Sequence, residues 1–73
     1  MAEWPVRSEV SGVVARVIAA AGTEVAEGDE VVIIEAMKME LPVLAPATGR
    51  IATILVAEGD TVAEGQPVAM LSR

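Results

Sequence analysis

Short runs of β-branched and aliphatic residues, separated by glycine-centred turn signals, make up most of this chain. Two such runs cover residues 13–18 and 31–34, and between them lie Gly22-Thr23 and Glu27-Gly28-Asp29. Runs of this length with such boundaries are typical of β-strands. Glycine at the corners supplies the positive φ that other residues reach only at a cost. The pattern therefore predicts a succession of short strands, about eight over the whole chain.

The same pattern occurs twice. Residues 12–28 return as residues 49–65, with the same spacing of three glycines and with Val25-Ala26-Glu27 repeated as Val62-Ala63-Glu64. Identical spacing argues against a chance match between two segments rich in Val and Ala. Two copies of a strand-rich unit predict an all-β domain, either two antiparallel sheets packed face to face or a flattened barrel. No linker divides the chain, so we expect one domain over residues 1–73.

A mirrored arrangement of apolar residues surrounds Lys38, the one lysine of the chain. Val-Val-Ile-Ile at 31–34 precedes it and Leu-Pro-Val-Leu at 41–44 follows it, which predicts a hairpin with Met37-Lys38 at its tip. Two-residue hairpin turns favour Asn-Gly and other glycine pairs, so a Met-Lys tip indicates side chains that serve another purpose. Strand alternation through the tip would place Met37 and Met39 on one face and Lys38 on the other, exposed and unpaired. A lone primary amine in this position is a candidate attachment point.

A helical turn is the alternative interpretation of this segment. Residues 35–40 are strong helix formers, and on such a turn Lys38 would be an ordinary surface lysine. The β-branched residues before the segment, Pro42 after it and its short length argue against a stable helix.

The neighbours of the lysine also allow a structural interpretation. Glu35 and Glu40 could be surface charges that contribute little to stability, and Met37 and Met39 could fill gaps in the core. The position of Met37 and Met39 on both sides of a solitary lysine favours a role in recognition by a partner. Trp4, followed by Pro5, is predicted to plug one end of the core from the first strand.

The composition excludes several classes of function. Trp4 is the only aromatic residue, the net charge is −6, and the four arginines are scattered. Neither stacking platforms nor basic clusters are available, so nucleic acid is not expected as a partner. Cysteine and histidine are both absent, which removes disulfides, thiol catalysis and the usual zinc ligands. Carboxylates and one lysine are a poor set for acid–base catalysis, so no catalytic or metal site is expected.

No apolar run approaches the roughly 20 residues needed to cross a bilayer. The first residues, Met-Ala-Glu-Trp-Pro, lack the basic and then apolar layout of a secretory signal. The acidic character also disfavours a membrane surface. We therefore expect a cytoplasmic protein that does not bind membranes.

The hairpin segment reads Glu35-Ala36-Met37-Lys38-Met39, with Gly-Asp-Glu-Val before it at 28–31 and Leu-Pro-Val-Leu-Ala-Pro-Ala-Thr-Gly after it at 41–49. Within a glycine-framed repeat, Ala-Met-Lys-Met is a specific signal. Over nearly its whole length the chain resembles the biotinyl (biotin carboxyl carrier) domain of the biotin/lipoyl attachment family. The resemblance implies a barrel-sandwich hybrid, a capped and flattened β-barrel of two four-stranded antiparallel sheets with quasi-two-fold symmetry.

The resemblance also implies a function. Lys38 would carry biotin in an amide bond formed by a biotin protein ligase. The biotinylated domain would then act as a swinging arm that moves carboxyl groups from a biotin carboxylase to a carboxyltransferase, without catalysing either step. Met37 and Met39 would serve recognition and placement of the arm. Ala36 belongs to the same motif, and Glu35 stands where the family commonly has an acidic residue.

The chain departs from the best-known bacterial acetyl-CoA carboxylase carrier. Ala19-Ala20-Ala21-Gly22 leaves no room for a protruding thumb, and no Pro/Ala-rich linker precedes Trp4. It is similar to a short, thumbless type. The acceptor of the carboxyl group stays open among acetyl-, propionyl- and pyruvate-type carboxylases, a urea carboxylase and a decarboxylase.

Two other functions remain as alternatives. Lipoyl domains of 2-oxo acid dehydrogenases share the fold and present a hairpin lysine, usually in Asp-Lys-Ala-like surroundings, whereas Met37 and Met39 favour biotin. The same barrel also occurs as an unmodified structural or adaptor module, in which Lys38 would be a bystander.

Overall fold

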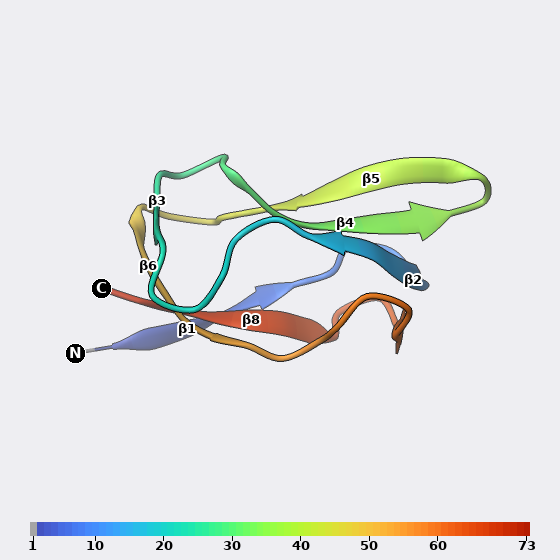
Figure 1. Cartoon of the computed structure of the whole chain (residues 1–73). Helices are drawn as coiled ribbons and strands as arrows, with labels where there is room; N and C mark the ends of the chain where they lie inside the picture. Colours follow the sequence, from blue (N-terminus) through green and yellow to red (C-terminus); the bar gives the residue numbers. More distant parts are fainter. Residues whose placement is uncertain (1) are drawn as a thin grey trace.

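The computed structural model describes residues 2–73 and consists of β-strands joined by turns (Figure 1). No helix occurs in this described part of the chain. The eight strands are β1 (Glu3–Arg7), β2 (Gly12–Val17), β3 (Glu24–Val25), β4 (Glu30–Ala36), β5 (Met39–Leu44), β6 (Gly49–Ile54), β7 (Thr61–Val62) and β8 (Pro67–Ser72). The predicted all-β class and the number of strands are confirmed, and the helical interpretation of residues 35–40 is wrong.

The strands form two four-stranded sheets, in the orders β1-β8-β6-β3 and β5-β4-β2-β7. All neighbouring strands pair antiparallel. Under the sequence repeat, β1 to β4 correspond to β5 to β8, and this correspondence converts one sheet order into the other. The molecule therefore has the expected quasi-two-fold symmetry. Each sheet takes two strands from each copy of the repeat, so the two halves are interleaved.

Four of the six repeated glycines lie at the corners, as the sequence predicts. Gly22, Gly28, Gly59 and Gly65 all have φ between 86° and 91°, a region that glycine reaches without steric cost. The backbone hydrogen bonds repeat with them: the Gly22 N–H donates to Ile51 O at 2.7 Å, and the Gly59 N–H donates to Val14 O at 2.8 Å. The two halves thus hold each other through equivalent turns.

Side chains close three of these turns. The backbone N–H of Ala26 donates to Asp29 Oδ2 at 2.9 Å, and the N–H of Ala57 donates to Asp60 Oδ2 at the same distance. In the third turn the N–H of Ala63 donates to Gln66 Oε1 at 3.0 Å. Such local bonds satisfy donors that no ladder partner reaches.

β-Bulges interrupt the alternation of side chains. The register shifts between Val14 and Arg16 where β2 pairs with β4, and between Ile51 and Thr53 at the equivalent place where β6 pairs with β8. A bulge adds one residue to one strand and locally changes which face a side chain takes. In β4, residues 31–34 are consecutively buried instead of alternating.

The core is aliphatic and lies between the sheets. The largest fully buried side chains belong to Val6, Val14, Val31, Val32, Ile34, Ile51, Val62, Val68 and Leu71, together with Ser8. The Ser8 hydroxyl donates to Val10 O at 2.6 Å, so its burial leaves no unsatisfied group. The prediction that Trp4 plugs the core is wrong, because Trp4 is 41% exposed on β1 and the Arg73 guanidinium lies 5.8 Å from its ring centroid.

The molecule is elongated, with principal extents of 36 × 17 × 17 Å. The β4–β5 hairpin projects from one end, and the two chain ends lie together at the other (Figure 1). There the N–H of Arg73 donates to Ala2 O at 3.2 Å. In the repeat, β8 is equivalent to β4 and β1 is equivalent to β5. The β8–β1 pair is therefore the counterpart of the β4–β5 hairpin, but no turn connects its two strands. Within the described residues, no helix is long and apolar enough to span a membrane.

Candidate functional site

The candidate site is the tip of the β4–β5 hairpin. The strands pair from Glu30 opposite Leu44 to Ala36 opposite Met39, which leaves Met37 and Lys38 as a two-residue turn. Both turn residues have positive φ, 53° at Met37 and 65° at Lys38. Positive φ at both positions defines the type I′ turn, whose twist matches that of the flanking strands.

The expectation that strand alternation continues through the tip is therefore wrong. Met37 and Lys38 form the turn, and only Met39 belongs to a strand. The side-chain directions at the tip follow from the left-handed conformation of the turn instead. Met37 and Lys38 are the only residues other than glycine with positive φ in the part of the chain that the structure describes.

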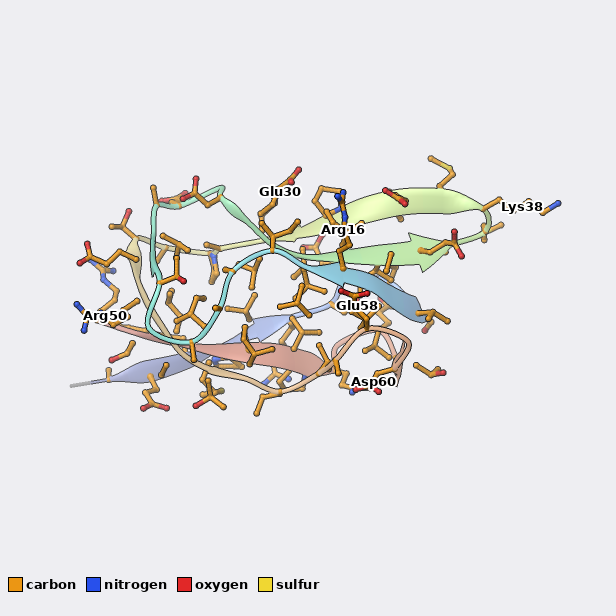
Figure 2. All side chains as sticks on the ribbon, viewed as in Figure 1. Arg16, Glu30, Lys38, Arg50, Glu58 and Asp60 are labelled. Atoms are coloured by element: carbon orange, nitrogen blue, oxygen red, sulfur yellow. The ribbon has the colours of Figure 1, made fainter. Side chains whose placement is uncertain are left out.

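The tip is open to solvent. Met37 is 94% exposed, Met39 is 60% exposed, and Lys38 is exposed between them. Figure 2 shows the Lys38 side chain pointing away from the body of the molecule, with its nitrogen at the far end. Within residues 2–73, the single ion pair joins Arg50 to Glu24 at 3.5 Å, and no hydrogen bond involves the Lys38 side chain. Its amine is free to react or to be recognised.

Two carboxylates face each other at the base of the turn. Glu35 and Glu40 are directly opposite in the ladder, one pair before Ala36 and Met39, and both are exposed. Like charges opposite each other in a ladder are unfavourable, although water screens them here. The hairpin thus carries a local excess of negative charge next to the lysine.

Gly12 fixes the distance between β2 and the hairpin. A Cβ at this position would overlap the Glu35 carbonyl oxygen and approach the Ile34 Cγ2 at 2.8 Å. Only glycine permits the strands to approach so closely here. In the sequence, Gly12 is recognisable as part of the repeat but not as a support of the site. Its signal was the recurrence as Gly49, where a Cβ would lie 2.6 Å from Ser72 O.

The tip contains the five residues that the sequence singled out, namely Glu35, Ala36, Met37, Lys38 and Met39. Of these, Ala36 is partly buried and the others are exposed. No group of three or more His, Cys, Asp or Glu side chains that could hold a metal ion occurs among the described residues. The chemistry that the tip offers is that of one accessible primary amine between two thioethers.

The described residues thus form an all-β barrel-sandwich that presents its single lysine, exposed and unpaired, on a tight hairpin. Residues 5–71 match the biotin/lipoyl family, described as biotin-requiring enzyme. The chain belongs to this family. The predicted membership of this family and the predicted fold are confirmed.

Three solved structures are similar to the chain. The urea carboxylase of Kluyveromyces lactis matches with a TM-score of 0.93 and 39% identity, over 99% of this chain and 6% of that chain. A single-chain, multi-domain long-chain acyl-CoA carboxylase matches with a TM-score of 0.90 and 34% identity, over 97% of this chain and 7% of that chain. The chain therefore spans only a small part of the length of these two carboxylases.

The third structure is a lipoyl domain. It belongs to the 2-oxoglutarate dehydrogenase complex from Azotobacter vinelandii and matches with a TM-score of 0.71 and 36% identity, over 96% of this chain and 91% of that chain. A comparison with curated proteins finds no match. The chain is thus a biotin/lipoyl attachment domain, similar to segments of two carboxylases and to a lipoyl domain.

Proposed function

We propose that this chain is a biotin carboxyl carrier in which Lys38 holds biotin through an amide bond. The observation that carries the proposal is the unpaired, exposed Lys38 amine at a type I′ turn. Both carboxylase neighbours have higher TM-scores, 0.93 and 0.90, than the lipoyl domain at 0.71. The Met-Lys-Met sequence at the tip also favours biotin over lipoate as the attached group.

The residues of the tip suit this attachment. The neutral form of a primary amine attacks an activated carboxyl group and forms an amide, so a ligase must first remove the ammonium proton. The Lys38 side chain has no hydrogen bond or ion pair within residues 2–73 that would have to break before it enters a ligase site. Acylation removes one positive charge and takes the formal net charge from −6 to −7. When attached, biotin supplies the ureido nitrogen that carries the carboxyl group.

The remaining roles are those of a carrier. Met37 and Met39 offer apolar, adaptable contacts to the enzymes that receive the tip. Glu35 adds negative charge beside the lysine, and Ala36 closes the ladder below it. The partners are a biotin protein ligase, a biotin carboxylase and a carboxyltransferase, met in the cytoplasm. The domain positions the arm and catalyses neither half-reaction.

Intact mass after incubation with biotin, ATP and a biotin protein ligase tests the proposal. One biotinyl group is expected on the wild type and none on Lys38→Arg, because a guanidinium stays protonated and does not attack an activated carboxyl. Arg50→Lys is the matched control, since position 50 is exposed on β6 at the opposite end of the molecule. This variant should accept one biotinyl group, not two. A wild type that stays unmodified contradicts the proposal.

Lipoylation of Lys38 is the second candidate. It is favoured by the 36% identity with the lipoyl domain over 96% of this chain. The same mass measurement with lipoate, ATP and a lipoate ligase distinguishes the two. A lipoyl group without a biotinyl group would make the chain a lipoyl carrier, and the absence of both would favour an unmodified structural or adaptor barrel.

A further inference from the structure

We propose that Met37 and Met39 form a methionine-oxidation site, in which conversion to the sulfoxides reduces the recognition of Lys38 by its partner enzymes. The inference rests on the proposed carrier function and names a regulation of the same site. Its starting observation is exposure. The two methionines that flank the lysine are 94% and 60% exposed, so an oxidant in solution reaches these residues without unfolding of the domain.

Met70 provides an internal comparison. It lies on β8, an inner strand of its sheet, paired with Pro5 on β1 and with Thr53 on β6, and is only partly exposed. Oxidation of methionine follows the access of the oxidant to the sulfur. Among the three methionines within residues 2–73, the order of reaction should therefore be Met37, then Met39, then Met70.

The reaction needs a two-electron oxidant of the peroxide class. The thioether sulfur attacks one peroxide oxygen, the O–O bond breaks, and a sulfur–oxygen bond forms. The sulfur loses two electrons, and the other peroxide oxygen leaves as water. A methionine sulfoxide reductase reverses the change with a thiol reductant: the oxygen leaves as water and two thiols become a disulfide.

The effect should fall on recognition and not on folding. Met37 lies in a turn with almost no buried surface, so a polar sulfoxide there breaks no packing. A partner that buries the methionine in an apolar contact meets a polar, chiral group instead. Oxidation at the tip should therefore change the surface that a partner contacts without lowering the stability of the barrel.

Peptide mapping after graded hydrogen peroxide treatment tests the first part. One oxygen atom should appear on Met37 and Met39 before it appears on Met70, while circular dichroism shows an unchanged fold. Oxidation of Met70 as fast as that of Met37, or unfolding that accompanies the first oxygen, would overturn the proposal. This measurement needs no ligase, so it stands even if Lys38 is not biotinylated.

The rate of biotinylation tests the second part. Oxidised wild type should be modified about tenfold more slowly than untreated protein, the order of effect expected when one methionine loses an apolar contact. The double variant Met37→Leu, Met39→Leu should show the same rate with and without peroxide, whatever its starting rate. Met70→Leu should be biotinylated more slowly after peroxide treatment, as the wild type is. Treatment with the reductase should restore the rate of biotinylation.

An oxidised wild type that is biotinylated at the untreated rate would overturn the link between oxidation and recognition. An untreated wild type that accepts no biotin contradicts the carrier proposal itself. The two failures are distinguishable, because the first requires a working ligase reaction on untreated protein.

Discussion

Two adjacent residues with side chains, Met37 and Lys38, hold positive φ at the tip of the hairpin. Residues other than Gly, Asn and Asp adopt this left-handed region at a cost of about 1 kcal/mol each. The rest of the hairpin offsets this cost with six paired positions in its ladder. The tip therefore keeps a methionine and a lysine where the backbone alone would favour Asn-Gly.

Replacing Met37 with asparagine should stabilise the domain. Asn is the preferred first residue of a type I′ turn, and Met37 has almost no buried surface to lose. Met37→Asn should raise the free energy of unfolding by about 0.5–1 kcal/mol, measured by urea denaturation. If Met37 contacts the ligase, the same variant should be biotinylated more slowly despite its higher stability.

Met39→Asn is the matched control. Met39 belongs to β5 and does not have positive φ, so asparagine should bring no gain there and a small loss in strand propensity. Equal stability changes at positions 37 and 39 would contradict the account of strain in the turn.

The sequence predicted the location of Lys38 but not its conformation. Mirrored apolar runs on both sides of the lysine indicate a hairpin and its centre, because pairing register follows the apolar pattern. Nothing in Met-Lys encodes positive φ, so the left-handed turn is set by the ladder beneath it. The prediction for Trp4 is wrong because large size and apolarity alone do not place a residue in the core: Val, Ile, Leu and Ala side chains fill it, and Trp4 stays 41% exposed.

At the scale of the elements, β2 and β4 depend on close approach at Gly12. Gly12→Ala would force a Cβ against the Glu35 carbonyl and should lower the free energy of unfolding by about 2–4 kcal/mol. Gly22→Ala meets no atom within 4 Å but must hold φ near 91°, which should cost about 1–2 kcal/mol. Urea denaturation of both variants measures the difference.

Gly49→Ala gives the symmetry-related control for Gly12→Ala. Its Cβ would lie 2.6 Å from Ser72 O, at the end of the molecule far from Lys38. We expect a similar loss of stability, but only Gly12→Ala should displace the hairpin and slow biotinylation under conditions where both variants are folded. Equal biotinylation of the two would show that Gly12 does not position the tip.

The bulges mark the limit of sequence prediction at this scale. Periodicity identified the strands near residues 13–18 and 31–34, yet a strict alternation fails because the register shifts beside Ala15. A bulge requires only one extra residue, and a run rich in Val and Ala contains no signal for where it falls. The turns were better predicted, since glycine at positive φ has a local cause.

At the scale of the whole molecule, the site and the core are separate. The exposed Lys38 side chain makes no hydrogen bond or ion pair with the rest of the described chain. The buried residues lie between the two sheets. Biotinylation should therefore change the free energy of unfolding by less than about 0.5 kcal/mol. Parallel thermal unfolding of unmodified and biotinylated protein checks this. A gain above about 1 kcal/mol would mean that the attached arm packs against the barrel.

The family resemblance implies the quasi-two-fold symmetry of the molecule, but the repeat does not predict that its two halves interleave. The internal repeat shows which strands of the two halves are equivalent, but it does not show which strands pair. In the structure β1 pairs with β8, and β2 pairs with both β4 and β7. These long-range pairings close the barrel and follow from burial of both apolar faces at once.

The two chain ends occupy the place of a second hairpin. Arg73 and Ala2 correspond in the repeat to Ala36 and Met39, the residues that flank the Met-Lys turn, and they are already joined by a hydrogen bond of 3.2 Å. Joining Arg73 to Ala2 through a second Met-Lys pair would make the backbone circular and would create a second Met-Lys turn at the opposite end of the molecule. If the carrier proposal holds, such a circular protein would present one attachment lysine at each end of a body 36 Å long, and it would engage two enzymes at once instead of one after the other.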